Sequence, residues 1–221
     1  MIALAIDTAT SALVTGVYDT VTGRAVDRVI DGARGHNEQL MPTIAELLDA
    51  ASLSVADIDA VVVGQGPGPF TGLRVGMASA AALGQALRVP VYGVSTLDAL
   101  AHGTTGRVLV ATDARRREVY WGLYDDARRV HGPEVSKPGE LAATGVTSVI
   151  IPEKLRSALP AELAELPGGE PTLSAAALIA GVDYDATPAP LEPAYLRRPD
   201  AVPPAPAPRS PAIPVVPGIP Q

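Results

Sequence analysis

The fold of this chain is decided by the stretch from Gly64 to Arg74, which reads Gly-Gln-Gly-Pro-Gly-Pro-Phe-Thr-Gly-Leu-Arg. The apolar run directly before it, residues 60–63, predicts a buried strand, and the small residues after it predict a helix over 71–88. Glycine accepts backbone conformations that other residues avoid, proline fixes φ, and the first N–H groups of a helix lack internal partners. The combination is typical of a strand-to-helix turn that faces phosphate or another anion. A rigid turn without a ligand uses the same residues, so both interpretations stay open.

Composition limits the classes of protein to which the chain can belong. It has 221 residues, of which 47% are hydrophobic and 4% aromatic, so alanine and valine must build much of the core. The absence of cysteine excludes a disulfide framework, a thiolate metal site and a cysteine nucleophile. No positively charged segment precedes the first apolar run, and no run approaches the roughly 20 residues that a membrane span needs. We expect a cytoplasmic protein without membrane contact.

The charge disfavours independent binding of nucleic acid. The formal net charge is -7 and the sequence pI is about 4.9, whereas a protein that grips phosphates alone normally has a basic face. The arginine clusters are short and occupy residues 115–117, 128–129 and 197–198. The first two lie at the ends of a predicted hairpin, where a solvated rim is the simpler interpretation.

The order of the predicted elements indicates an α/β fold with mixed sheets flanked by helices. An apolar face at helical spacing predicts the first helix. A polar turn between two alternating strands predicts a hairpin in a second, reduced block. After Pro188 the composition changes, and the proline-rich segment 199–221 predicts an extended, largely disordered tail. The predicted strands are 2–6, 12–18, 24–30, 60–63, 91–94, 108–112 and 118–124, the helices are 37–51 and 71–88, and shorter pieces follow at 149–151 and 173–180.

A stripe of small residues runs along the helix predicted over 71–88. Each glycine inside a helix lowers helix stability by about 1 kcal/mol relative to alanine. A compensating interaction is therefore expected, and close packing of another backbone against the stripe is the usual one. That backbone can belong to the chain's own sheet or to another subunit, and both alternatives stay open. If it belongs to another subunit, both predicted helices, 37–51 and 71–88, contribute to a partner interface. The predicted interface residues are His36, Leu40, Ile44, Leu47, Gly72, Arg74, Gly76, Ala80 and Gly84.

The end of the first strand supplies a second candidate site. A carboxylate there, Asp7, can orient a metal-bound water, and the hydroxyls of Thr8 and Thr10 can contact phosphate oxygens. With Gly66 and Gly68 they form a predicted phosphate-facing site, degenerate because no opposing glycine loop is evident. The same Asp-Thr-Ala-Thr-Ser sequence also makes a good turn without any ligand.

Several of these segments together resemble the bacterial TsaB (YeaZ) family, over about residues 1–198. The segments 34–42 and 94–101 are highly specific in combination, and the proline-rich tail lies outside the resemblance. The segments that carry it are 7–10, 34–42, 64–74, 94–101, 113–115 with 118–120, and 193–197.

The resemblance implies an actin-like (ASKHA, ribonuclease H-like) fold of two lobes, residues 1–104 and a reduced lobe at 105–198. It also implies a role in making threonylcarbamoyladenosine next to the anticodon of ANN-decoding tRNAs. A TsaD-like paralogue would catalyse the transfer from threonylcarbamoyl-AMP, with this chain as its non-catalytic partner and a TsaE-like ATPase docked on the pair. The resemblance further implies a homodimer in isolation and contact with tRNA only through the complex. ATP or ADP and a metal would be bound by the partner subunits, with no cofactor held tightly by this chain.

Two enzyme classes remain as alternatives. An actin-like ATPase or small-molecule kinase needs a second glycine loop, and the nearest candidate, Gly168-Gly169, reads as a linker because prolines flank it. A glycoprotease-like metallopeptidase needs convergent ligands, yet His36, His102 and His131 are far apart in sequence. The chain also has no Gly-x-Ser-x-Gly elbow for a serine nucleophile.

Overall fold

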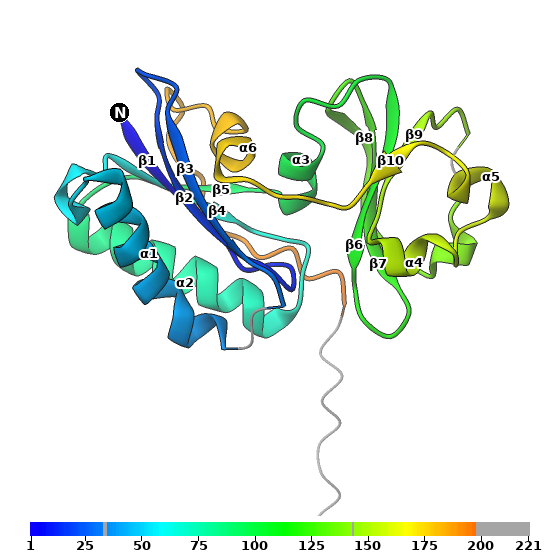
Figure 1. Cartoon of the computed structure of the whole chain (residues 1–221), viewed down its shortest axis with the longest axis horizontal. Helices are drawn as coiled ribbons and strands as arrows, with labels where there is room; N and C mark the ends of the chain where they lie inside the picture. The colour runs from blue at the N-terminus through cyan, green and yellow to red at the C-terminus, as the bar shows by residue number, and fades with distance from the viewer. Residues whose placement is uncertain (33–34, 143, 198–221) are drawn as a thin grey trace, which may run out of the picture.

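The computed structural model describes residues 1–32, 35–142 and 144–197, and it contains two five-stranded mixed sheets flanked by helices (Figure 1). The first sheet has the order β3-β2-β1-β4-β5. Its antiparallel meander joins β1 (Ile2–Asp7), β2 (Leu13–Asp19) and β3 (Ala25–Ile30). The strands β4 (Ala60–Gly64) and β5 (Val91–Val94) continue the sheet parallel to β1. The α/β class and the strand predictions for this half are confirmed.

Two long helices, α1 (His36–Ala51) and α2 (Phe70–Leu87), cover one face of the first sheet (Figure 1). They form because leucine, isoleucine and small residues recur at helical spacing and can be buried together against alternate residues of the strands. The resulting core includes Leu4 and Ile6 of β1, Val61 and Val63 of β4, and Leu73 of α2. The 3₁₀ turn η1 (Val55–Asp57) connects α1 to β4.

The second sheet has the order β10-β9-β6-β7-β8. The predicted hairpin is present, formed by β6 (Arg107–Asp113) and β7 (Val119–Asp125). The other bounds are β8 (Arg128–Ser136), η2 (Pro138–Glu140), β9 (Ser148–Ile150), α4 (Glu153–Arg156), α5 (Ala161–Ala164) and β10 (Gly168–Gly169). The interpretation of Gly168-Gly169 as a linker was wrong, because this pair forms a short parallel ladder with β9.

Two short helices, α3 (Thr96–Leu100) and α6 (Ala175–Ala180), join the halves (Figure 1). The sequence pattern placed residues 105–198 in a second lobe, but α6 returns and packs on β1 to β4 of the first sheet, on the face opposite α1 and α2. One hydrophobic cluster contains residues of both sheets, including Ala5, Val62, Val110 and Tyr124. The two lobes are therefore joined through a shared core, and the end of the described chain belongs to the first lobe.

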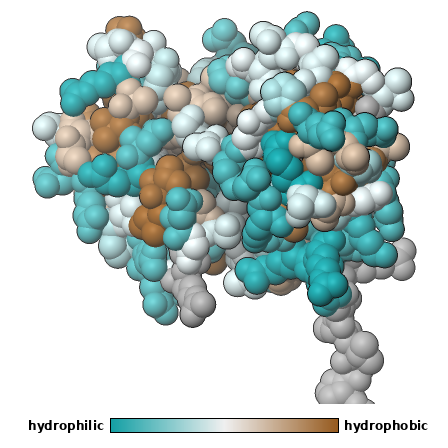
Figure 2. All heavy atoms as spheres, turned by 45° about the vertical axis from the view of Figure 1, so that its right-hand side comes forward, coloured by the Kyte–Doolittle hydropathy of each residue, from teal (hydrophilic) through white to brown (hydrophobic). Residues whose placement is uncertain are grey.

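The proline-rich tail predicted at 199–221 lies outside the described residues. On the face that Figure 2 shows, hydrophobic residues gather in separate small areas among hydrophilic ones. Within the described ranges, none of the helices combines the length and the apolar character that crossing a bilayer requires.

Candidate functional site

The carboxylate of Asp7 lies at the centre of a buried hydrogen-bonded network behind the glycine-proline turn. The Thr96 hydroxyl donates to Asp7 Oδ2 over 2.6 Å, and the backbone N–H of Ala9 donates to Oδ1 over 2.8 Å. The same threonine oxygen accepts from the N–H of Gly66 at 3.2 Å, so the network ties β1 to the turn and to α3. Burial raises the pKa of Asp7 to about 6, against the opposing effect of these hydrogen bonds. Because Asp7 is fully buried and both its oxygens accept from the chain, the prediction that it faces a ligand was wrong.

Thr8 is also committed to the fold. Its hydroxyl donates to the carbonyl of Gly72 over 2.7 Å and accepts from the N–H of Gly76 over 3.0 Å. The side chain is buried at 1% exposure, so it fastens α2 to the end of β1 and cannot reach a phosphate. The phosphate-facing role predicted for Thr8 was therefore wrong.

The glycines of the turn are needed because their own chain approaches closely. A Cβ on Gly68 would lie 2.2 Å from the carbonyl oxygen of Ala9. A Cβ on Gly66 would lie 2.8 Å from a methyl group of Leu73, and the φ of Gly66 is +89°. Gly66 and Gly68 thus serve close packing, and their predicted phosphate-facing role was wrong. Of the five residues predicted for that site, Thr10 does line an open cleft.

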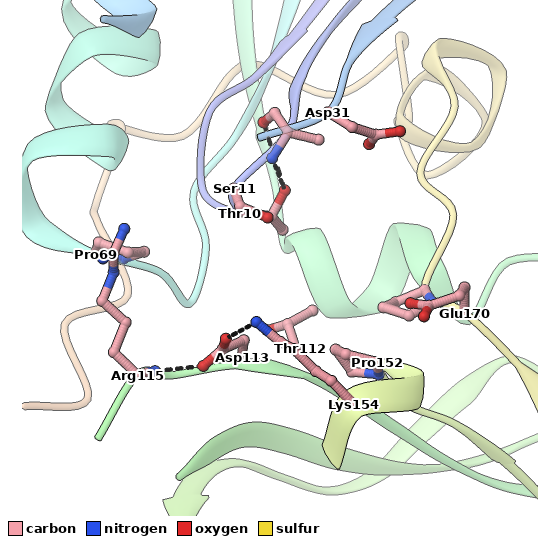
Figure 3. Close-up of a pocket in the computed structure, with 12 residues that line it drawn as sticks. Thr10, Ser11, Asp31, Pro69, Thr112, Asp113, Arg115, Pro152, Lys154 and Glu170 are labelled. Carbon is pink, nitrogen blue, oxygen red and sulfur yellow. Dashed lines mark hydrogen bonds and ion pairs between the residues drawn. The ribbon is translucent and has the colours of Figure 1, made fainter. Parts of the chain in front are cut away.

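This cleft has a volume of about 420 Å³ and is lined by both lobes (Figure 3). The first lobe contributes Thr10, Ser11, Ala12, Asp31 and Pro69, and the remaining lining residues are Thr112, Asp113, Arg115, Pro152, Lys154, Glu170 and Pro171. The lining contains two cations, three carboxylates and three hydroxyls besides three prolines and an alanine, and it suits a small polar molecule rather than an apolar one. The cleft is the concave candidate site between the lobes.

Lys154 and Asp113 form an ion pair in the cleft, and the backbone N–H of Arg115 binds the same carboxylate. Lys154 donates to Asp113 Oδ2 over 2.5 Å, and the N–H of Arg115 donates to Oδ1 over 2.7 Å. Burial raises the pKa of Asp113, but these two hydrogen bonds outweigh it, so the net pKa is lowered and the carboxylate is held ionised. Within the described ranges, no three His, Cys, Asp or Glu side chains are grouped so that they could hold a metal ion.

Sequence reasoning missed Lys154 and Glu170 as residues of this cleft. Lys154 lies in the short helix α4 and Glu170 directly after β10, and both elements are too short to give a periodic signal. Asp113 is a carboxylate at the end of a strand, next to a turn, and this was the one feature of the sequence that could have pointed to the cleft.

The small-residue stripe of α2 faces the chain's own sheet. A Cβ on Gly76 would lie 2.5 Å from Thr8 Oγ1, and a Cβ on Gly84 would lie 2.1 Å from a methyl group of Val91. Gly72 lies equally close to the end of β1, since its Cβ would be 2.4 Å from the carbonyl oxygen of Thr8. Ala80 is fully buried in the same core. The assignment of Gly72, Gly76, Ala80 and Gly84 to a partner interface was therefore wrong. The three glycines make room for Thr8, directly after β1, and for Val91 of β5, and Ala80 is buried in the core.

The apolar stripe of α1 is also internal. Leu40, Ile44 and Leu47 are each no more than 2% exposed and pack in the core beneath the first sheet, so their assignment to a partner interface was wrong. His36 is half-buried, and burial lowers its pKa although a backbone hydrogen bond with Ser11 acts in the opposite direction. Arg74 is exposed. Of the nine predicted interface residues, these last two keep side-chain surface that another protein can reach.

The opposite sides of α1 and α2 form an exposed surface that is rich in alanine. We call it the outer helix face. It lies on two helices that contact each other, and small apolar side chains recur along its exposed side. Its members are Met41, Ala45, Ala78, Ala81, Ala82 and Ala86, with Met41 47% exposed.

Two mixed sheets with helices on their faces and a polar cleft between them define an actin-like α/β protein. The solved structure titled "YeaZ from Pseudomonas aeruginosa" superposes with a TM-score of 0.67 at 29% identity, covering 81% of this chain and 89% of that one. A family model described as "TsaD: tRNA N6-adenosine threonylcarbamoyltransferase" matches residues 31–176. The chain belongs to this family, within the group of proteins named TsaB or YeaZ, so the resemblance found in its motifs is confirmed.

Two relatives show how far the similarity extends. An uncharacterized protein of Mycobacterium tuberculosis (strain ATCC 25618 / H37Rv) is 51% identical over 205 residues, which cover 90% of this chain and 93% of that protein. The "tRNA threonylcarbamoyladenosine biosynthesis protein TsaB" of Escherichia coli (strain K12) is 38% identical over 138 residues, 59% of each chain.

Proposed function

We propose that this chain is the non-catalytic partner subunit of a complex that makes threonylcarbamoyladenosine in tRNA. A TsaD-like paralogue transfers the threonylcarbamoyl group from threonylcarbamoyl-AMP to the adenosine next to the anticodon of ANN-decoding tRNAs. Membership of a family whose named members act in this biosynthesis supports the pathway. The observation that carries the partner role is the outer helix face, because the buried sides of α1 and α2 are already occupied by the sheet while the alanine-rich side is exposed.

The buried position of Asp7 supports a non-catalytic role. A catalytic carboxylate has to reach a substrate, a metal or a water molecule, whereas both oxygens of Asp7 accept hydrogen bonds inside the chain. The carboxylate at the end of β1 therefore serves here to fix the turn that precedes α2.

In the proposed assembly, the outer helix face is the docking surface. Alanine side chains let a second pair of helices approach closely, so a paralogue with a similar face can dock there and a second copy of this chain can take its place in isolation. In this proposal a TsaE-like ATPase binds the assembled pair, tRNA is reached through the complex, and ATP or ADP and the metal are held by the partner subunits.

A charge-neutral pair of substitutions tests the docking. Ala78→Glu with Ala82→Lys places long side chains on the exposed side of α2, and the i, i+4 pair supports the helix, so the chain itself should remain folded. The matched control is Ala180→Lys, an exposed alanine of α6 on the opposite face of the same sheet. Calorimetry with the TsaD-like paralogue should show affinity reduced at least tenfold for the double variant and unchanged for the control.

The same variants should be assayed for threonylcarbamoyl transfer to tRNA in the reconstituted system. Loss of transfer that follows loss of pairing supports the partner role. Wild-type affinity of the double variant for the paralogue would place the interface elsewhere and remove the basis of the proposal.

The cleft between the lobes favours a second candidate function, the binding of ATP. Lys154 and Arg115 can neutralise phosphates, and the hydroxyl of Thr10 can donate to them. Calorimetry with ATP on the isolated chain and on Lys154→Met tests this alternative. Micromolar binding that the substitution abolishes would favour an ATPase or kinase.

A further inference from the structure

Three segments that are far apart in sequence bring arginine and aromatic side chains together at one edge of the molecule. They are the start of α2, the turn between β6 and β7, and the last described residues of the chain. We call this surface the arginine–aromatic patch. Its members are Phe70, Arg74, Arg115, Arg116, Arg117 and Tyr195.

The aromatic part of the patch is a preassembled stack. The rings of Phe70 and Tyr195 lie 5.1 Å apart between centroids with an interplanar angle of 29°, and the Arg74 guanidinium carbon lies 4.0 Å from the centroid of the Phe70 ring. Arg74 Nε also donates to the Tyr195 hydroxyl over 3.4 Å. Phe70 remains 48% and Tyr195 40% exposed, so both rings keep accessible surface.

The arginine part of the patch is a turn with a fixed conformation. Arg115, Arg116 and Arg117 are all exposed and all left-handed, with φ of 60°, 54° and 61°. The turn is closed by hydrogen bonds from the Ala114 N–H to the Glu118 carbonyl and from the Glu118 N–H to the Arg115 carbonyl, at 2.9 and 3.0 Å. Non-glycine residues rarely adopt the left-handed region, and here three in succession do so, which places the three arginines together at the tip of one turn.

Contacts between the segments make the patch continuous. Arg197, two residues after Tyr195, forms an ion pair with Glu118 at the foot of the arginine turn. Arg115 and Pro69, the residue before Phe70, line the same cleft, and Figure 3 shows the Arg115 side chain directed toward Pro69. The turn, the stack and the C-terminal segment are thus held side by side.

We infer that the arginine–aromatic patch binds RNA with unstacked bases, such as a loop of tRNA. Clustered guanidinium groups bind phosphates, and exposed rings and a stacked guanidinium offer planar surfaces to bases. Arginine and aromatic residues are also enriched in protein interfaces, so a protein contact is the competing outcome of the test below. Four cations among six side chains favour a polyanion such as RNA. The surface goes beyond the proposed function, because it gives this chain a direct contact with tRNA within the complex. It also revises the expectation drawn from the net charge of -7, since the exposed arginines gather on one turn rather than being spread over the surface. The naming of tRNA as the RNA rests on that function.

The test measures binding of the full chain to two fluorescent probes, a single-stranded RNA of about 12 nucleotides and an unmodified tRNA, by anisotropy at about 50 mM salt. In the test variant Arg115, Arg116 and Arg117 are replaced by asparagine, which tolerates the left-handed conformation. The matched control replaces Arg24, Arg88 and Arg128 by asparagine. These are three exposed arginines at the far end of β3, the far end of α2 and the opposite end of the β6–β7 hairpin.

The triple turn variant should bind both probes at least tenfold more weakly, and the slope of log K against log salt should fall by about 2, since each lost phosphate contact on a single strand removes about 0.7. The control should bind as the wild type does. Tyr195→Leu should weaken binding about fivefold or more because base stacking is lost, while Tyr195→Phe should retain it.

Absence of RNA binding by the wild type, or an equal loss in the control variant, would overturn the inference. Turn variants that bind RNA normally but no longer bind the TsaD-like paralogue would identify the patch as a protein contact and would also overturn it. Because the outer helix face and the patch are tested by separate variants, failure here leaves the pairing experiment of the proposed function intact.

Discussion

Replacing Gly76 by alanine tests whether the small-residue stripe is reserved for the chain's own sheet. The new methyl group would lie 2.5 Å from Thr8 Oγ1, far inside van der Waals contact. That oxygen cannot move freely, because it donates to Gly72 and accepts from the N–H of residue 76. Displacing it sacrifices two hydrogen bonds worth about 1 kcal/mol each, and strain adds a further 1 kcal/mol or so. Alanine returns about 1 kcal/mol of helix propensity, so the net loss in the free energy of unfolding should be about 2 kcal/mol.

The assay is urea unfolding followed by far-UV circular dichroism, with Thr8→Ala as the second arm of a double-mutant cycle. Without the hydroxyl, the nearest atoms to the new methyl group are Thr8 Cβ at 3.6 Å and Ile6 Cγ2 at 3.7 Å, which are ordinary contacts. In the Thr8→Ala background the change from Gly76 to alanine should therefore be neutral or stabilise by up to about 1 kcal/mol. Equal effects of the glycine replacement in both backgrounds would refute the reasoning.

Three further perturbations test other parts of the structure. Asp7→Asn should remove the part of the pH dependence of stability that Asp7 contributes, because burial raises the pKa of Asp7 to about 6, whereas an unfolded aspartate titrates near 4. The wild type should therefore gain stability as the pH falls from about 7 to 4, and urea titrations of the variant should lack this gain. Tyr124→Phe should cost about 2 kcal/mol, because the buried phenol donates to Asp98 Oδ1 over 2.8 Å, and a thermal melt that matches the wild type would contradict the role of this bond. Arg156→Met should destabilise the second sheet by about 2 kcal/mol, since its guanidinium donates to the carbonyls of Val149, Ala164 and Leu166, and hydrogen exchange should show the loss first in β9.

The first sheet and its two long helices could be predicted because their periodicity is strong. The strand β8 could not, because Arg128–Ser136 is mostly exposed and contains a Gly-Pro pair, so it carries no apolar alternation. The helix α3 is a single turn, too short for a periodic signal. The return of α6 to the first sheet depends on tertiary packing that no local pattern encodes.

The candidate site was harder to predict than the fold, for a physical reason. An apolar or small-residue stripe shows that one face of a helix is buried, but the stripe does not identify the backbone that covers it. Leu40 and Gly76 therefore had two interpretations, and the structure assigns both residues to the chain's own core. A hydroxyl or carboxylate after a strand is equally ambiguous, since Asp7 and Thr8 satisfy backbone groups within the chain.

The cluster that contains Ala5 and Val62 together with Val110 and Tyr124 has a mechanical consequence. In an enzyme whose two lobes close on a nucleotide by a hinge motion, little apolar surface can be buried between the lobes. Here residues of both sheets pack in one hydrophobic cluster, so separating the lobes would expose buried side chains such as Val62 and Tyr124 to water. We expect the two lobes to move as one rigid body, so the surface that binds other proteins is formed before they bind. Any conformational change that the assembly requires would then take place in the partner proteins.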